Sequence, residues 1–418
     1  MIGITQPVVN DVKNTIYSLT GLRFFAALAV VLFHYSSLMS LPAPVQRLIQ
    51  QGPAGVSFFF CLSGFILTYN YFDWFKLDLA RIRSFFCARF ARVFPMYFIA
   101  LILITPITLY FIYFEPISVN QYIGVNPNRG QILVSWISNM SFLHVYVPSK
   151  LFQQLWNSPS WSVADEVFFY MVFPYFSRYI LGHFNKMRSF FLLFICVFSI
   201  EIFLFLGLSG FFWVAFDKAS FENLMIFFVY RSPFLRIWEF LLGCITGAMF
   251  LKFRRRESKY PMMSVLDNIK YRNIIILSLL VVMILIGLIS PPIGPLGTVF
   301  DWLRWYVLYT PFFLIMIAVI ASGKTFMDRL LEHPWIVMLG EASYSLYITH
   351  WLLCVILLRK SQTGTVIAGW VPFFAIIVSI MASIVFFKLI EYPARRLLRA
   401  EMNISLMQVK YSKRRHQP

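Results

Sequence analysis

The chain has 418 residues, of which 59% are hydrophobic, 19% are aromatic and only 13% are charged. A soluble protein carries roughly 25% charged residues, so this composition excludes an ordinary soluble domain and predicts an integral membrane protein. The formal net charge of +18 does not indicate nucleic-acid binding, because the basic residues form short clusters between apolar runs.

A spanning helix needs about 20 mostly apolar residues, and ten stretches of the chain meet that length. We therefore expect an all-α, polytopic membrane bundle, with one transmembrane domain over residues 16–399. The stretch 211–230 is also apolar, but its charged residues favour an interfacial or re-entrant segment. The ten expected spans are 20–40, 54–72, 93–114, 162–181, 189–208, 233–251, 273–290, 304–322, 339–358 and 369–389.

Lysine and arginine mark one side of the membrane. They concentrate in the connections 73–92, 182–188 and 252–272, and are scarce in the alternate loops. Positive loops face the cytoplasm, so both termini are expected there, with 1–15 as a short cytoplasmic segment and 400–418 as a basic tail on lipid headgroups. The five cysteines are scattered singly, and their spacing predicts no metal site.

The first span carries two polar residues in an apolar run. Arg23 and His34 are eleven residues apart, which on a helix places them on one face and about 16 Å apart along the axis. An ionisable residue inside the membrane is costly and is a functional candidate by default, although His34 could also be a structural histidine. Desolvation in the outer half of the bilayer favours the neutral imidazole, the state that a general base needs.

The fourth expected span contains a second candidate, Glu166. The segment 156–174 enters it from the outer side, with Trp156 and Trp161 as interfacial anchors, so Glu166 is expected at the depth of His34. A carboxylate and an imidazole at equal depth could form a base and its orienting partner. The alternative is a solvated helix start, which suits Asp165 better than Glu166.

Two arginines stand where the third span leaves the cytoplasm. Arg89 and Arg92 are three residues apart, beside Tyr97, and could clamp a phosphate on one helix face. Ordinary positive-inside charge is the competing interpretation. The pair Arg236 and Glu239, one turn apart, is expected to be mutually neutralised.

Taken together, these segments resemble membrane acyltransferase family 3, which includes bacterial O-antigen and exopolysaccharide O-acetylases. In two places the chain departs from the commoner family pattern: it reads ADEVFFY where many members have paired glutamates, and it has Ser57 where many have an acidic residue. The patches that carry the resemblance, in family order, are GLRFFAALAVVLFHY, GVSFFFCLSGF, the arginine pair with RVFPMY, SPSWSVADEVFFY, RSPFLRIWEFLLG, LGEASYSLYITHW and IEYPARRLLR.

The resemblance implies transfer of an acyl group, commonly acetyl, from cytoplasmic acetyl-coenzyme A to a hydroxyl of an envelope or secreted glycan. It implies no tightly bound cofactor; the partners are the acyl-coenzyme A donor, a carbohydrate or lipid-linked glycan acceptor and membrane lipids, in a bacterial inner membrane. His34 would be the base or the acyl relay. By the same resemblance Glu166 would be the second catalytic residue, Arg23 the electrostatic partner of His34 or part of the donor channel, and Arg89 and Arg92 would bind the donor phosphates. His350, near the middle of the ninth expected span, is a third catalytic candidate, with a hydrogen-bonded structural histidine as the alternative. Tyr97 and Trp161 are further substrate-binding candidates.

Two other functions fit parts of the pattern. A transporter or flippase of a glycan or lipid-linked sugar would also have about ten spans with buried polar residues, but would be expected to show repeated, broken helices, which the sequence lacks. A glycosyltransferase using a polyprenyl-phosphate sugar would need cations on its lipid donor's side, where the predicted outer loops have few.

Overall fold

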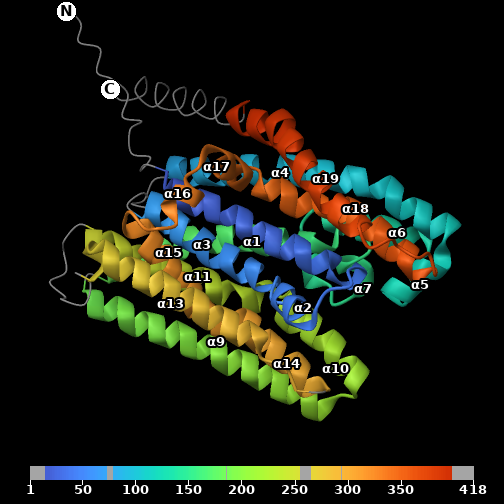
Figure 1. Cartoon of the computed structure of the whole chain (residues 1–418), viewed down its shortest axis with the longest axis horizontal. Helices are drawn as coiled ribbons and strands as arrows, with labels where there is room; N and C mark the ends of the chain where they lie inside the picture. The colour runs from blue at the N-terminus through green and yellow to red at the C-terminus, as the bar shows by residue number, and fades with distance from the viewer. Residues whose placement is uncertain (1–14, 73–78, 185, 255–264, 293, 398–418) are drawn as a thin grey trace, which may run out of the picture.

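The computed structural model describes residues 15–72, 79–184, 186–254, 265–292 and 294–397, and these residues form helices without any β-strand. Most of the long helices lie side by side along the longest axis of the molecule (Figure 1). The helices are α1 (Tyr17–Tyr35), α2 (Ala43–Ile49), α3 (Ala54–Tyr71), α4 (Leu79–Phe114), α5 (Pro116–Ile123), α6 (Arg129–Met140), α7 (Lys150–Gln153), α8 (Trp161–Tyr175), α9 (Met187–Ala215), α10 (Lys218–Leu224), α11 (Pro233–Arg254), α13 (Ile269–Leu288), α14 (Pro295–Leu303), α15 (Tyr309–Ser322), α16 (Asp328–Leu331), α17 (Pro334–Glu341), α18 (Ser343–Gln362) and α19 (Val371–Phe386).

The expected all-α membrane bundle is confirmed. Within the described ranges, eight helical segments are long and apolar enough to cross a membrane, and a ninth is counted if α17 and α18, which meet at a bend of 64°, form one span. The expected segments 1–15 and 400–418 lie almost entirely or entirely outside the described residues. Which side of a membrane each end faces stays a prediction.

The fourth expected span, 162–181, is wrong as a lipid-facing crossing. It corresponds to α8, which has 15 residues, and the π-helical turn that follows at Phe176–Ile180. This segment is not among those apolar enough to cross alone. Most of α8 is buried by its neighbours, so protein rather than lipid surrounds its two carboxylic residues.

Two other boundaries differ from expectation. The region 211–230 is not a separate re-entrant segment: its start completes α9, and its end forms α10 and a π-helical turn that leads into α11 as part of one apolar segment, 220–254. Helix α4 is longer than the expected span 93–114, because it already begins at Leu79. Arg89 and Arg92 therefore lie within a continuous helix, which fixes their relative orientation.

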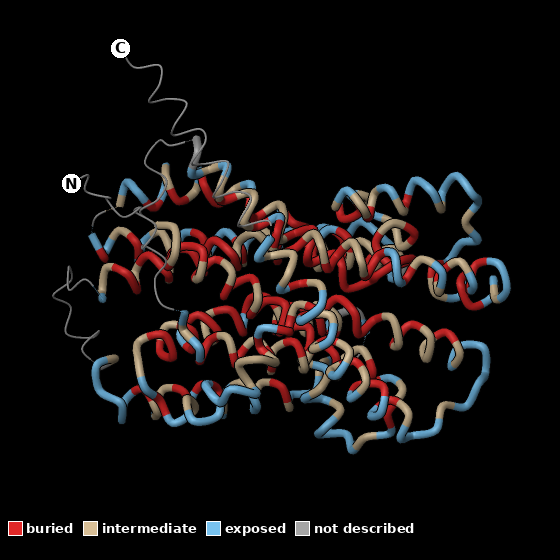
Figure 2. The backbone as a smooth tube through the Cα atoms, turned by 90° about the horizontal axis from the view of Figure 1, so that it is seen from above, coloured by how far each residue is buried: buried red, intermediate tan, exposed pale blue. Residues whose placement is uncertain are grey.

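The bundle has helices that are buried by protein and helices that face outward on its perimeter. In the segment Ala43–Tyr71, which contains α2 and α3, 83% of the most apolar 18 residues are buried by protein, whereas in α9 (Met187–Ala215) only 17% are. Figure 2 shows buried stretches gathered in the inner helices, while exposed stretches follow the outer helices and the connections at the ends. The large exposed apolar side chains of α9, such as Phe203 and Val214, make this helix a lipid-facing element.

The inner helices α3 and α11 approach closely through glycines. A Cβ added to Gly64 would lie 2.1 Å from the carbonyl oxygen of Phe240, and one added to Gly243 would lie 2.2 Å from that of Cys61. Small residues four apart, as in Gly243 and Gly247, are the usual way for membrane helices to pack backbone against backbone. This contact fixes the centre of the bundle against which α8 and α1 are placed.

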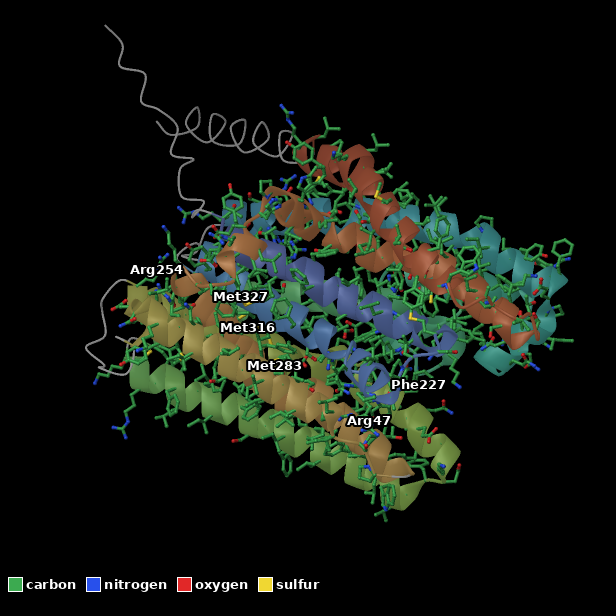
Figure 3. All side chains as sticks on the ribbon, viewed as in Figure 1. Arg47, Phe227, Arg254, Met283, Met316 and Met327 are labelled. Carbon is green, nitrogen blue, oxygen red and sulfur yellow. The ribbon has the colours of Figure 1, made fainter. Side chains whose placement is uncertain are left out.

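The two ends of the bundle differ in what they carry. The start of α1 and the short helices α16 and α17 lie at one end, and α5, α6 and α10 lie at the other (Figure 1). Arg254, in a connection expected to be cytoplasmic, and Arg47, in a loop expected to be external, lie toward opposite ends (Figure 3). We use "inner end" for the end of the α1 start and "outer end" for the end with α5 and α6.

Candidate active site

The interior holds two histidines in direct contact. Nδ1 of His34 on α1 lies 3.0 Å from Nε2 of His350 on α18, and the two rings stack with centroids 5.0 Å apart. His350 is fully buried, whereas His34 keeps part of its surface accessible. The structure therefore brings together two of the three predicted catalytic residues. Both histidines are candidates from the sequence alone, but nothing in the sequence pairs them.

The hydrogen bonds of this pair define which nitrogen of His34 is available. Nδ1 of His350 lies 3.1 Å from the carbonyl oxygen of Leu346, which can only accept a hydrogen bond, so this nitrogen carries the proton. In a neutral His350, Nε2 is then an acceptor, and Nδ1 of His34 must donate to it. The proton of His34 is thus committed to Nδ1, and its Nε2 presents a lone pair.

Hydrogen bonds from two side chains to backbone carbonyls of α18 hold this helix against α1 and against the segment before α8. The hydroxyl of Tyr35 donates to the carbonyl oxygen of His350 at 3.3 Å, and the side-chain amide of Asn157 donates to the carbonyl oxygen of Ile348 at 2.8 Å. A buried polar group without a partner would cost free energy, so these bonds favour one position of α18. That position keeps the two imidazoles in register.

Glu166 lies in a second polar cluster. Its Oε1 accepts hydrogen bonds from Ser63 Oγ at 3.0 Å and from the Tyr170 hydroxyl at 2.5 Å. Arg23 and Arg92 lie within Coulombic range of this carboxylate, but neither guanidinium makes a hydrogen bond or ion pair with any described residue. We call Arg23, Arg92, Glu166 and Tyr170 the inner cluster.

The expected meeting of Glu166 with His34 does not occur. Glu166 is close enough to interact with Arg23, which precedes His34 by about 16 Å along α1, and its hydrogen-bond partners are on α3 and α8. The depth estimate failed because it assumed that α8 starts at the membrane surface. The helix starts in the protein interior instead, so Glu166 lies farther toward the inner end.

Arg89 flanks the inner cluster on an aromatic surface. Its guanidinium donates to the Tyr71 hydroxyl at 3.2 Å and lies 5.5 Å from the centre of that ring, with the Tyr170 ring centre at 5.8 Å. Tyr170 also lies within Coulombic range of Arg92. The expected common face of Arg89 and Arg92 is therefore confirmed, while a bound phosphate stays a prediction.

The other two predicted substrate-binding residues have structural partners. The hydroxyl of Tyr97 donates to the carbonyl oxygen of Asn139 at 2.7 Å, which ties α4 to α6. Trp161 and Trp156 are 3% and 1% exposed, so they are core residues and not interfacial anchors. The prediction overlooked that the segment before α8 folds into the bundle, where Trp156 Nε1 donates to Ser135 Oγ.

A third group of buried polar side chains contains the expected ion pair. Arg236 and Glu239 lie 3.2 Å apart and are both about 1% exposed, which confirms that they neutralise each other. Arg236 also donates to Ser57 Oγ at 3.1 Å, the position where many relatives were expected to have an acidic residue. Asp165 is fully buried, so its interpretation as a solvated helix start is wrong.

Sequence reasoning missed several polar residues of the interior. Glu391 is 1% exposed, accepts a 2.5 Å hydrogen bond from Ser345 Oγ and lies within Coulombic range of Arg23 and Arg92. His144, in the connection between α6 and α7, lies 3.2 Å from Ser160 Oγ, and burial lowers the pKa of His144 to about 3. Glu391 lies in the patch IEYPARRLLR, so its carboxylate could have been recognised as a candidate. No spacing pattern indicated His144.

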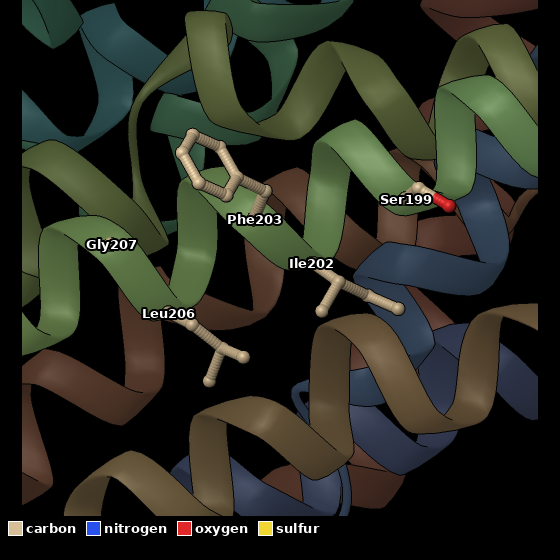
Figure 4. A pocket seen from close by; sticks show the side chains of 5 residues that line it. All are labelled: Ser199, Ile202, Phe203, Leu206 and Gly207. Carbon is tan, nitrogen blue, oxygen red and sulfur yellow. The ribbon is translucent and has the colours of Figure 1, made fainter.

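Within the described residues, neither a group of metal ligands nor the hollow on α9 adds to this site. In the described part of the chain, no group of three or more His, Cys, Asp or Glu side chains could hold a metal ion. The hollow in Figure 4 is lined by Ser199, Ile202, Phe203, Leu206 and Gly207, all on α9. It is an open depression on a lipid-facing helix and contains no group capable of acid or base chemistry.

The fold and the site define a class: a multi-pass helical membrane protein with an imidazole pair and, apart from it, an inner cluster whose two arginines have no hydrogen-bond partner among the described residues. The family model described as an acyltransferase domain matches residues 16–389, and the chain belongs to this family, membrane acyltransferase family 3. No solved structure matches the chain significantly.

Two relatives illustrate the similarity. The chain is 25% identical over 396 residues to the O-acetyltransferase OatA of Staphylococcus aureus, covering 90% of this chain and 57% of that protein. It is 28% identical over 166 residues to the acyltransferase MdmB of Streptomyces mycarofaciens, covering 38% of this chain and 39% of that protein. The chain therefore matches little more than half the length of the first relative and less of the second.

Proposed function

We propose that this protein is a membrane O-acyltransferase that moves an acyl group, acetyl in the simplest case, from cytoplasmic acyl-coenzyme A to a hydroxyl of an envelope or secreted glycan. Family membership supports acyl transfer, and the relative named as an O-acetyltransferase supports an oxygen acceptor. A bacterial inner membrane is the setting that gives the protein access to both substrates.

The observation that carries the proposal is the 3.0 Å contact between Nδ1 of His34 and Nε2 of His350. The contact with His350 commits Nδ1 of His34, so Nε2 is the nitrogen that can take a proton from an acceptor hydroxyl. As the hydroxyl oxygen attacks the thioester carbonyl, the carbon–sulfur bond breaks and the coenzyme A thiolate leaves and takes up a proton. An acyl relay would use the same nitrogen as the nucleophile.

The inner cluster supports binding of the donor. Arg23 and Arg92 are partly buried cations without hydrogen-bond partners in the described chain, and guanidinium groups bind phosphate through paired donors. Arg89 lies one turn from Arg92 and could add a third cation. With the phosphates at Arg23, the long pantetheine arm would run along α1 toward His34.

The test is transfer of labelled acetyl from acetyl-coenzyme A to surface glycan in membranes that contain the protein. His34→Ala should reduce transfer at least a thousandfold, because it removes the general base or the nucleophile, at unchanged protein level. His333→Ala, at an exposed histidine before α17, is the matched control and should leave transfer intact.

Full transfer by the His34→Ala protein would refute the catalytic role of His34. A deletion strain that loses glycan export but keeps glycan acetylation would instead favour the transporter hypothesis. Comparing the mass of surface polysaccharide from cells with and without the gene would identify the modified sugar.

A further inference from the structure

We infer that the acceptor glycan is anionic, and that Arg231 and Arg359 bind its carboxylate or phosphate group at the outer end of the site. This inference rests on the proposed function and specifies its substrate class. Neither arginine has a role in the chemistry described above.

Arg359 is a buried cation whose hydrogen-bond donors are unused. Its side chain is 1% exposed, and none of its Nε, Nη1 and Nη2 atoms has a hydrogen-bond partner among the residues that the structure describes. The rings of Phe111 and Tyr122 lie 4.9 and 5.7 Å from its guanidinium carbon. Such contacts stabilise the charge but do not satisfy the N–H groups, and unsatisfied buried donors to a charge are expensive.

Arg231, in the segment before α11, is the second cation of the proposed site. Its Nη1 donates to the carbonyl oxygen of Gln153 at 3.0 Å and its Nη2 to Ser158 Oγ at 3.1 Å, while its Nε has no partner. Unlike Arg359, Arg231 keeps part of its surface accessible. It also lies within Coulombic range of His34, so a ligand bound to it would be close to the base.

Tyr122 on α5 connects the two arginines. Both Arg231 and Arg359 lie within Coulombic range of its hydroxyl, and this side chain is also partly accessible. Three elements distant in sequence, α5, α18 and the segment before α11, therefore bring two guanidinium groups within range of one tyrosine. We call Arg231, Arg359 and Tyr122 the outer arginine site.

Among the described residues, no carboxylate is dedicated to the outer arginine site. Glu115 is within Coulombic range of Arg359 but binds Lys360, with 2.5 Å between Oε1 and Nζ. Asp165 is within range of Arg231 but is shared with Arg236. Neither arginine of the outer arginine site forms an ion pair with a carboxylate in the described chain. An anionic oxygen group from a ligand would supply the missing acceptors.

The spacing along α18 indicates where the anion lies on the acceptor. Arg359 follows His350 by nine residues, or about 13 Å along the helix axis. The charge that Arg359 binds is therefore carried on a neighbouring sugar or linkage and not on the hydroxyl-bearing carbon itself. Sugar acids and phosphate-linked sugars both meet this requirement.

The kinetic test uses the full-length protein in membrane vesicles with labelled acetyl-coenzyme A. The acceptors are three oligosaccharides of equal length: neutral, carrying a uronic acid, and carrying a sugar phosphate. We expect kcat/KM to be about tenfold to a hundredfold higher for one or both acidic acceptors, the size of a charge-assisted hydrogen bond. Arg359→Gln should remove that ratio, Arg359→Lys should retain part of it, and Arg129→Gln, at an exposed arginine of α6, should leave it unchanged.

A second measurement detects binding without turnover. At matched ionic strength, glucuronate or glucose 6-phosphate should raise the thermal midpoint of the detergent-solubilised protein, glucose should not, and Arg359→Gln should abolish the shift. The sugar acid that gives the larger shift identifies carboxylate or phosphate as the bound group. Equal use of neutral and acidic acceptors together with no anion-dependent shift would overturn the inference while leaving acyl transfer established. Absence of transfer to every acceptor would refute the proposed function itself.

Discussion

The histidine pair and the inner cluster are both polar sites inside an apolar bundle, but their hydrogen bonding differs. Nδ1 of His34 donates to Nε2 of His350, and Nδ1 of His350 donates to the Leu346 carbonyl oxygen, so both rings are held in place. In the inner cluster, Glu166 is bonded whereas Arg23 and Arg92 have no partner in the described chain. A site whose groups are held by hydrogen bonds is organised before substrate arrives, as catalysis requires. A site whose hydrogen-bond donors lack acceptors is completed when a ligand supplies them.

The largest effect that separates the two sites is expected at His350. His350→Ala should lower kcat about a hundredfold with little change in the KM for acetyl-coenzyme A. The substitution removes the acceptor for the Nδ1–H group of His34, so the His34 ring is free to rotate and to change tautomer. His350→Gln should recover part of the rate, since its amide oxygen can accept from His34. Steady-state kinetics in membranes would measure this. A matching rise in donor KM would show that His350 contributes to donor binding instead.

Substitution in the inner cluster should have the opposite kinetic signature. Arg92→Gln and Arg23→Gln are each expected to raise the KM for acetyl-coenzyme A about tenfold or more, because each removes a charged donor to phosphate. Arg83→Gln, at an exposed position of α4, is the control for loss of general positive charge. An unchanged donor KM in both variants would mean that the inner cluster does not bind the donor.

The smallest effect is expected at Tyr97, which belongs to neither site. Tyr97→Phe removes the hydrogen bond to the Asn139 carbonyl and should lower the free energy of unfolding by about 1 kcal/mol. Its kinetic constants should stay at wild-type values, with the exposed Tyr113→Phe as the control for loss of a hydroxyl. A raised KM for either substrate would restore the substrate-binding role predicted from its position beside the arginines.

Hydropathy predicted the membrane bundle because apolar length decides which segments can face lipid. The same reasoning failed for α8, which lies inside the protein, where the lipid rule does not apply. That failure also misplaced Glu166, since its depth was counted from a solvent-exposed helix start, whereas the first residues of α8 are buried. The prediction that Trp156 and Trp161 are interfacial anchors was wrong because both are buried. A buried tryptophan and an interfacial one cannot be told apart from the sequence.

The pairing of His34 with His350 was beyond prediction from sequence. It depends on the position of α18 relative to α1, and α18 is preceded by a bend of 64° that no local pattern specifies. The inner cluster depends likewise on contacts of α1, α4 and α8 that are far apart in sequence. What spacing could predict was the common face of Arg89 and Arg92, because a helix fixes it locally.

The central claim is that Nε2 of His34 acts on the acceptor while Nδ1 is held by His350. Replacing His34 by histidine methylated at Nε2 or at Nδ1, through genetic code expansion, tests it atom by atom. The account predicts that acetyl transfer is abolished by the Nε2 methyl group and only reduced by the Nδ1 methyl group, at equal protein levels. Retained transfer with Nε2 methylated, and loss with Nδ1 methylated, would contradict it.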